Sequence, residues 1–150
     1  MSNFKASVSM ITFNHEKFIA EAIESIMSQQ TSFEFELVIG DDGSTDNTRT
    51  ICEQYQKQYG NKIKLIFNEK NIGSVNNFLQ NIYACKGEFI AICDGDDFWT
   101  DNSKLQKQVS FLESHTDFSF CFTNVRSVDV NGKQICIIDK KLLTKRSEVG

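Results

Sequence analysis

Short apolar runs alternate with amphipathic segments along the first two thirds of the chain. The apolar runs cover residues 6–13, 35–40 and 62–67, and a fourth run begins at residue 89. Between them, apolar residues recur every three or four positions, as they do along one face of a helix. Strands that alternate with helices pair in parallel, because the chain crosses back through each helix before the next strand begins. The sequence therefore predicts an α/β fold with a mostly parallel sheet.

The pattern is less regular beyond residue 100. Leu105, Val109 and Leu112 predict one more helix, and residues 118–125 predict a fifth strand. Residues 128–138 predict a hairpin that turns at Asn131 and Gly132, because an Asn-Gly pair suits a two-residue turn. The remaining tail has no clear stop signal. We therefore expect the chain to end inside a domain.

Composition and charge argue against several classes of function. The chain has 150 residues, with 20 Asp and Glu against 16 Lys and Arg, so no broad basic surface is available to bind nucleic acid. No apolar run approaches the roughly 20 residues that span a bilayer. The five cysteines include no CxxC pair, and an odd number favours reduced thiols. We expect a cytoplasmic protein, with attachment to the inner face of the membrane through further sequence as an open alternative.

Polar residues follow all four predicted strands of the sheet. The strands end at "TFNHE", "DDGSTDNT", "NEKNIG" and "DGDD". In an open α/β sheet, ligands bind in the crevice beyond the carboxyl ends of the strands. One shared site at this edge is therefore the simplest interpretation.

Two adjacent carboxylates, Asp41 and Asp42, end the second predicted strand. Gly43 suits a tight turn after them, and Ser44 or Thr45 is expected to cap the next helix, as Asn14 is expected to cap the first. A capping role for Ser44 or Thr45 does not explain why two carboxylates precede them at the end of a strand. An acid in this place can accept hydrogen bonds from a nucleobase or a ribose hydroxyl.

Three carboxylates follow the fourth predicted strand. Asp94 and Asp96 flank Gly95, which lets the backbone bend so that both side chains face one point. A hard divalent cation binds carboxylate oxygens and keeps positions for water and substrate phosphates. A solvated acidic turn is the simpler alternative, but these acids come directly after a buried strand and adjoin Phe98 and Trp99. The sequence therefore favours a site for Mg²⁺ or Mn²⁺.

The segments "VSMITFN", "IGDDGSTDNT", "NIGSVNNF" and "KGEFIAICDGDDFWTDNSKLQKQ" together resemble the nucleotide-sugar-binding half of the family 2 glycosyltransferases. The resemblance covers about residues 8–112, with the motifs in order. Within the family, the chain resembles bacterial members that assemble polysaccharides or surface glycans. The resemblance implies the GT-A fold, a Rossmann-like sheet with helices on both faces.

The resemblance also implies roles for individual residues. Asp94 and Asp96 match the family's DxD motif, with Asp96 contacting the metal and Asp94 contacting the ribose or the water around the metal. A second group would surround the nucleoside and sugar of the donor: Thr12, Phe13, Asn14, Asp42, Asn71, Gly73 and Asn77.

The implied reaction is the transfer of a sugar from a nucleoside-diphosphate sugar to a hydroxyl of a carbohydrate or glycolipid, with inversion and with a divalent metal. The catalytic base is unknown and is expected beyond Gly150. Residues 1–125 would form the donor-binding region, and residues 126–150 the incomplete start of the acceptor side. Ile11 stands where many members have proline, and "VNN" replaces their "ARN" triplet at residues 75–77.

Other functions remain open on these residues. The isolated chain can bind a nucleotide sugar without turnover. A receiver-like signalling domain also has an acidic pocket, but it needs an acceptor aspartate after strand three and a lysine after strand five, where this chain has "FNEKN" and "FTNV". A sugar nucleotidyltransferase needs a glycine-rich basic loop, and "TFNHEKF" is not one. His15 lies where it can approach a phosphate, or it is structural.

Overall fold

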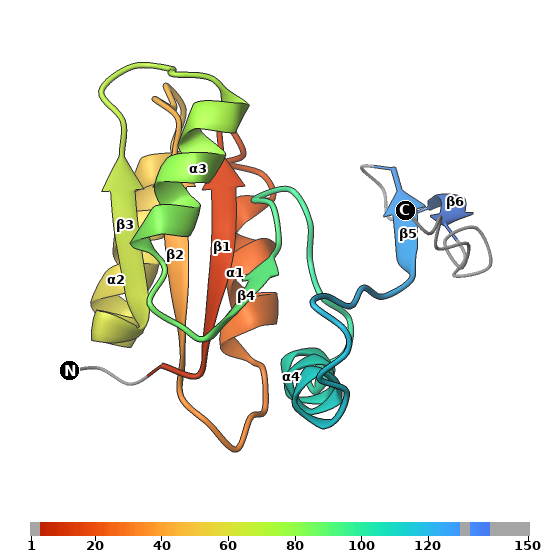
Figure 1. Cartoon of the computed structure of the whole chain (residues 1–150). Coiled ribbons are helices and arrows are strands. Elements are labelled where there is room, and N and C mark those ends of the chain that lie inside the picture. Colours follow the sequence, from red (N-terminus) through yellow and green to blue (C-terminus); the bar gives the residue numbers. More distant parts are fainter. Residues whose placement is uncertain (1–3, 130–132, 139–150) are drawn as a thin grey trace, which may run out of the picture. The chain divides into compact units, whose positions relative to one another are not determined.

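The computed structural model describes residues 4–129 and 133–138. Contacts within the chain divide it into two compact units, residues 1–111 and 112–150. The first unit contains a parallel sheet with the spatial order β3-β2-β1-β4 (Figure 1). Its strands are β1 (Ala6–Thr12), β2 (Phe35–Asp41), β3 (Ile63–Phe67) and β4 (Phe89–Ile92). The predicted parallel sheet is confirmed.

Helices cover both faces of this sheet, as expected. Helices α1 (Ile19–Met27) and α2 (Thr48–Tyr59) lie on one face, and α3 (Ser74–Ala84) lies on the other (Figure 1). A short 3-10 turn, η1 (Gly60–Lys62), joins α2 to β3, and α4 (Lys104–Ser114) follows β4. Because every crossover passes through a helix, all four strands end at the same edge of the sheet.

The main core lies between the sheet and helix α1. Alternate residues of β1 point into it, as do Leu37 and Ile39 of β2. Ile19, Ile23 and Ile26 of α1 are fully buried against them, which accounts for the helical spacing of its apolar residues. This face is the rigid support for the loops that follow the strands.

The other face of the sheet is held by amide groups. Asn77 and Asn81 lie one turn apart on α3 and are both buried. Asn77 Nδ2 donates to the carbonyl oxygen of Gly40 at 2.8 Å. Asn81 Nδ2 donates to the Met10 and Val38 carbonyl oxygens at 3.1 and 3.0 Å. Helix α3 is therefore fastened to β1 and β2 by hydrogen bonds that few other side chains could make.

The second unit contains a two-stranded antiparallel sheet of β5 (Val125–Val128) and β6 (Gln134–Ile138). The predicted hairpin is confirmed, while its turn at Asn131 and Gly132 lies outside the described residues. The strand predicted at residues 118–125 is wrong, because only Val125 of that range is in a strand. Alternating Phe118, Phe120 and Phe122 imitate a strand pattern, yet a strand also needs a partner backbone, and no described strand pairs with residues 118–124.

Candidate functional site

Backbone hydrogen bonds tie together the loops that follow the four strands of the sheet. The amide of Asp42 donates to the Thr12 carbonyl oxygen at 3.0 Å, and the amide of Gly95 donates to the Ile11 carbonyl oxygen at 2.9 Å. The amide of Asn68, just after β3, donates to the Asp41 carbonyl oxygen at 3.0 Å. The polar segments that follow the strands therefore meet at one edge.

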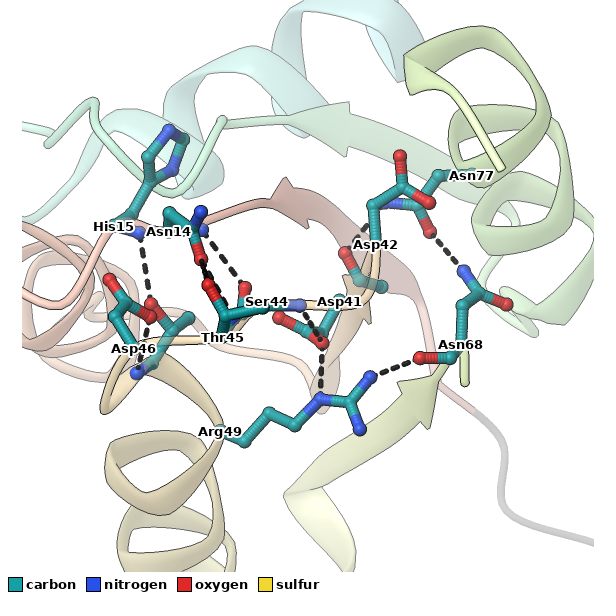
Figure 2. Close-up of polar contacts among 12 residues, drawn as sticks. Asn14, His15, Asp41, Asp42, Ser44, Thr45, Asp46, Arg49, Asn68 and Asn77 are labelled. Carbon is teal, nitrogen blue, oxygen red and sulfur yellow. Dashed lines mark hydrogen bonds and ion pairs between the residues drawn. The ribbon is translucent and has the colours of Figure 1, made fainter. Parts of the chain in front are cut away.

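Asp41 is fully buried and anchors the end of β2. Its Oδ1 accepts hydrogen bonds from Arg49 Nε at 2.6 Å and from the Ser44 amide at 3.1 Å. The Arg49 guanidinium also donates to the Asn68 carbonyl oxygen (Figure 2). It lies over the Phe67 ring as well. One arginine thus neutralises the buried carboxylate and joins the ends of β2 and β3.

Asp42 holds the loop that precedes α3. Its carboxylate accepts from the amides of Ile72 at 2.7 Å and Gly73 at 3.1 Å, and the residue is only 3% exposed. Gly73 has a φ of 89°, a left-handed conformation that favours glycine. Because each carboxylate oxygen has two lone pairs, Asp42 retains acceptor capacity beside the bonds it makes to this loop.

Asn77 is buried behind the same loop. Besides its bond to Gly40, its Oδ1 accepts from Asn68 Nδ2 at 3.2 Å (Figure 2). A Cβ atom on Gly40 would lie 2.7 Å from Asn77 Oδ1, so only glycine allows this close approach. Asn77 therefore links α3, β2 and the residue after β3.

The loop after β1 packs against the loop after β2. Asn14 has a φ of 55°; its amide donates to Ser44 Oγ at 2.9 Å, and its Oδ1 accepts from the Thr45 amide at 2.8 Å (Figure 2). The predicted caps are thus wrong: Asn14 does not cap α1, and neither Ser44 nor Thr45 caps α2. These side chains instead bond to each other's loop, so the two loops support one another.

Glu16 and Asp46 extend this exchange between the two loops. Glu16 Oε2 accepts from the Asn47 amide at 3.0 Å, so its charge lies at the start of α2 rather than α1. Asp46 in turn accepts from the Glu16 amide at 3.1 Å and from the Thr48 amide at 3.0 Å. Burial opposes the effect, but these hydrogen bonds lower the pKa of Asp46.

Thr12 and Phe13 lie at the end of β1, where this strand meets the turn after β4. The Phe13 side chain is 41% exposed, as a ring that stacks on a planar ligand needs to be. Thr12 is buried, and its Oγ1 has no hydrogen-bond partner. This hydroxyl lies 2.7 Å from the position that a Cβ atom on Gly95 would occupy. The turn after β4 is therefore packed directly onto the end of β1.

Three carboxylates surround this turn. Asp94 is partly buried, while Asp96 and Asp97 are exposed. Burial raises the pKa of Asp94, and the neighbouring charges of Asp97 and Asp96 raise it further. Burial and the charge of Asp96 likewise raise the pKa of Asp97. His15 approaches from the β1 side, with Nε2 3.9 Å from Asp96 Oδ2. Burial and mutual repulsion both disfavour the ionised carboxylates, so a cation bound at this turn would relieve the repulsion.

The donor set of this turn suits a hard cation that shares its coordination with a substrate. No group of three or more His, Cys, Asp and Glu side chains within residues 4–129 and 133–138 could hold a metal alone. Mg²⁺ is commonly bound by one or two carboxylates together with water and substrate phosphates. Asp94 and Asp96 fit that mode of binding. The Thr12 hydroxyl, which has no hydrogen-bond partner and lies beside Gly95, adds a further polar group to this turn.

A cavity lies elsewhere, at the opposite edge of the sheet. Its volume is about 650 Å³, and its lining includes Met27, Gln29, Phe35, Tyr59 and Lys62. It contains no cluster of carboxylates comparable to the Gly95 turn, and the strands present their amino ends to it. This cavity is therefore not the candidate site, because α/β sheets bind ligands at the carboxyl ends of their strands, where the Gly95 turn lies.

Sequence reasoning missed Arg49 and Glu16. Arg49 resembles an ordinary exposed residue of a helix, and its contact with Asp41 joins residues on different elements. Glu16 shortly precedes α1 in the sequence, whereas its carboxylate lies at the start of α2 in the structure. No local spacing identifies either contact. The only available signal was that Asp41 had to be buried and would then need a cation.

Comparisons with known proteins show the family to which the chain is similar. Residues 7–146 match the family model of Glycosyl transferase family 2. EpsE of Bacillus subtilis, named as a glycosyltransferase, is 40% identical over 131 residues, which cover 85% of this chain and 45% of EpsE. TuaG of the same species, named as a teichuronic acid biosynthesis glycosyltransferase, is 35% identical over 123 residues, which cover 80% of this chain and 48% of TuaG.

A solved structure shows the same fold. The crystal structure of S. aureus TarS in complex with UDP matches with a TM-score of 0.66 at 32% identity, and the match covers 75% of this chain and 33% of that one. The expected GT-A fold is thereby confirmed. The chain spans about a third to a half of the length of these relatives. It belongs to glycosyltransferase family 2.

Proposed function

We propose that this chain is the donor-binding part of a glycosyltransferase that transfers a sugar from a nucleoside diphosphate to an acceptor hydroxyl. The observation that carries the proposal is the acidic turn at Asp94 and Asp96, packed onto the loop after β1. A nucleotide sugar needs one region for the nucleoside and another for the diphosphate, and this edge offers both. UDP in the complex with TarS supports a nucleotide ligand for a related chain.

The nucleoside would lie against the loops after β1, β2 and β3. The exposed ring of Phe13 offers a face for the base, beside Thr12 and Asn14. Asp42 has acceptor capacity for a base N–H or a ribose hydroxyl, while holding the loop that contains Gly73. The side-chain nitrogen of Asn77 bonds to Gly40 and its side-chain oxygen bonds to Asn68. We therefore propose that Asn77 supports the nucleoside-binding loops and does not contact the ligand.

The diphosphate would lie over the Gly95 turn. We propose that Asp96 contacts a Mn²⁺ or Mg²⁺ ion and that Asp94 contacts the ribose or the water around the ion. When bound, such a cation neutralises the charge that develops on the departing diphosphate. Asp94 is partly buried beside the buried Gly95, and we propose that the two carboxylates on either side of this glycine face the same ion.

The remaining parts of the reaction are proposed from the family. The acceptor would be a carbohydrate or glycolipid hydroxyl, deprotonated by a carboxylate outside this chain, and the anomeric configuration would be inverted. We place the donor region in residues 1–125 and the start of the acceptor side in residues 126–150. The sugar transfer would take place in the cytoplasm, as a step of bacterial glycan or polysaccharide synthesis. No helix in the described parts of the chain is long and apolar enough to cross a bilayer.

A binding measurement tests the proposal directly. UDP, GDP and thymidine diphosphate are titrated into the chain by calorimetry, with and without Mn²⁺, and then into Asp96→Ala. We expect one nucleotide to bind in the presence of Mn²⁺ and to lose about tenfold or more in affinity in the variant. Asp101→Ala removes a nearby exposed carboxylate and should bind as the parent does. Binding that is equal in both variants would refute the assigned metal position.

Transfer by the isolated chain is a separate question. Because the chain spans under half of the length of EpsE and TuaG, we expect it to bind the donor with little turnover. Release of the free nucleotide from UDP-GlcNAc and GDP-mannose, followed with and without added acceptor, measures this. Efficient transfer by these 150 residues would show that a catalytic base lies within them.

A further inference from the structure

The ring of His15 lies against the Gly95 turn, beside the carboxylates that follow β4. Its Nε2 is 3.9 Å from Asp96 Oδ2, and its Nδ1 is 3.0 Å from the position that a Cβ atom on Gly95 would occupy. Interaction with this ring opposes the rise in the pKa of Asp94 and of Asp97, so the ring lies near both carboxylates. His15 is therefore the side chain from β1's loop that faces the acidic turn.

The backbone holds this ring in place before any ligand arrives. The amide of His15 donates to Thr48 Oγ1 at 2.9 Å, and its carbonyl oxygen accepts from the amides of Phe18 and Ile19 at 2.9 Å each. The preceding residue, Asn14, is held in a left-handed conformation by the loop after β2. A side chain preset in this way needs little ordering to contact a ligand.

The surroundings of the two ring nitrogens favour one tautomer. Nδ1 is buried and has no hydrogen-bond partner. A buried N–H without an acceptor is more costly than an unused lone pair, so we assign the hydrogen to Nε2. The 3.9 Å from Nε2 to Asp96 is too long for a hydrogen bond. The Nε2–H is therefore available to an atom that enters beside Asp96.

We propose that His15 Nε2 donates a hydrogen bond to a phosphate oxygen of the nucleoside diphosphate that binds at Asp96. The inference rests on the proposed function, and it decides in favour of a ligand contact for a residue that the proposed function does not use. A ring N–H that faces an anionic phosphate makes a charge-assisted hydrogen bond. That bond strengthens as negative charge develops on the leaving diphosphate, so His15 would favour bond cleavage as well as binding.

The test compares a ligand that has phosphates with one that lacks them. In the presence of Mn²⁺, the affinities of UDP and uridine, or of GDP and guanosine if that is the nucleotide bound, are measured for the parent, His15→Leu and His15→Gln. We expect His15→Leu to weaken the diphosphate about tenfold and the nucleoside less than about twofold. His15→Gln keeps an N–H donor and should recover most of the loss. His115→Leu, which changes the other histidine, should leave both affinities unchanged.

Three results would overturn the inference, and each has a distinct meaning. Equal losses for diphosphate and nucleoside would show that His15 only supports the loop. A matching loss of Mn²⁺ affinity in the nucleotide-free protein, measured by electron paramagnetic resonance, would make His15 a metal ligand instead. If the parent binds neither diphosphate, the proposed function itself fails, and this is decided before any variant is made.

Discussion

Some residues at the candidate site are constrained by close contacts that no other residue type would permit. Gly95 is the clearest case, since it is buried between the end of β1 and the ring of His15. Its sequence context, between two aspartates, predicted a bend. The contact that makes glycine necessary could not be predicted, because it depends on where Thr12 and His15 lie in three dimensions.

Replacing Gly95 with alanine should disrupt the acidic turn. The new methyl group would lie 2.7 Å from Thr12 Oγ1 and 2.8 Å from Thr12 Cβ, so the turn has to move away from β1. We expect Gly95→Ala to abolish Mn²⁺-dependent nucleotide binding and to lower thermal stability modestly. Gly87→Ala, which meets the Ala6 backbone far from the site, is the control for stability loss alone. Unchanged nucleotide affinity in Gly95→Ala would contradict this account of the turn.

The charge of Asp94 should make the folded protein less stable at neutral pH. Burial and like charges raise its pKa above 3.8, so the ionised form is disfavoured in the folded state. The penalty is present above the folded-state pKa and fades as the pH falls through it toward 3.8. Asp94→Asn should therefore raise the melting temperature by a few degrees at pH 8, with a gain that shrinks toward pH 4.

Asp101 supplies a control of opposite sign for that experiment. Its hydrogen bonds with Lys107 and Ser103 lower its pKa, so its charge favours the folded state at neutral pH. Asp101→Asn should slightly lower the melting temperature at pH 8, with an effect that disappears in acid. A melting temperature that falls for Asp94→Asn at pH 8 would show that Asp94 is stabilised by contacts other than those described.

At the scale of elements, apolar spacing predicted the strands and helices of the first unit, because burial on a periodic face is a local property. How α3 attaches to the sheet could not be predicted in this way. Its buried positions are asparagines, and its exposed residues include Val75 and Tyr83, the reverse of an ordinary amphipathic helix. The hydrogen bonds to strand carbonyls that explain this join residues more than thirty positions apart.

Substitution of Asn81 should therefore lower the stability of the fold more than is usual for a polar helix residue, because polar helix residues are mostly exposed. Asn81→Ala removes donors from two carbonyl oxygens and should cost about 1–3 kcal/mol of unfolding free energy, as for other buried hydrogen bonds. Asn81→Asp should cost more, because a carboxylate would face those oxygens. Urea denaturation measures both, and exposed Gln80→Ala on the same helix should change stability by less than about 0.5 kcal/mol. Equal stability of the alanine and aspartate variants would contradict the proposed attachment.

At the scale of the whole molecule, the core of the first unit ends with α4. Leu105 and Val109 are buried in that core, whereas most residues from 113 to 128 are exposed. We expect a chain that ends at Ser114 to unfold cooperatively with nearly the parent's stability. A chain that ends at Ser103 should lose several kcal/mol, since deletion of each large buried side chain costs about 2–5 kcal/mol. Thermal unfolding followed by circular dichroism tests both; equal stability of the two would contradict this boundary.

The alternation of elements along the chain was sufficient to predict the parallel sheet and the edge that carries the candidate site. It failed at residues 118–124, where alternating phenylalanines have no strand partner among the described residues. Pairing is decided by what lies next to a segment, and a periodic pattern does not contain that information. The same limit applies to the loops of the site, whose mutual support became visible only in three dimensions.

The central claim is that a nucleoside diphosphate and a divalent cation bind at the carboxyl edge of the sheet. The most direct test is the broadening of backbone amide signals by Mn²⁺ in the presence of the bound nucleotide, recorded by nuclear magnetic resonance on isotopically labelled protein. We predict selective broadening at Asp94–Asp97 and at His15, with Gly60 and Lys62 at the opposite edge unaffected. Broadening centred on the cavity near Met27 and Tyr59, or spread evenly over exposed carboxylates, would contradict the account.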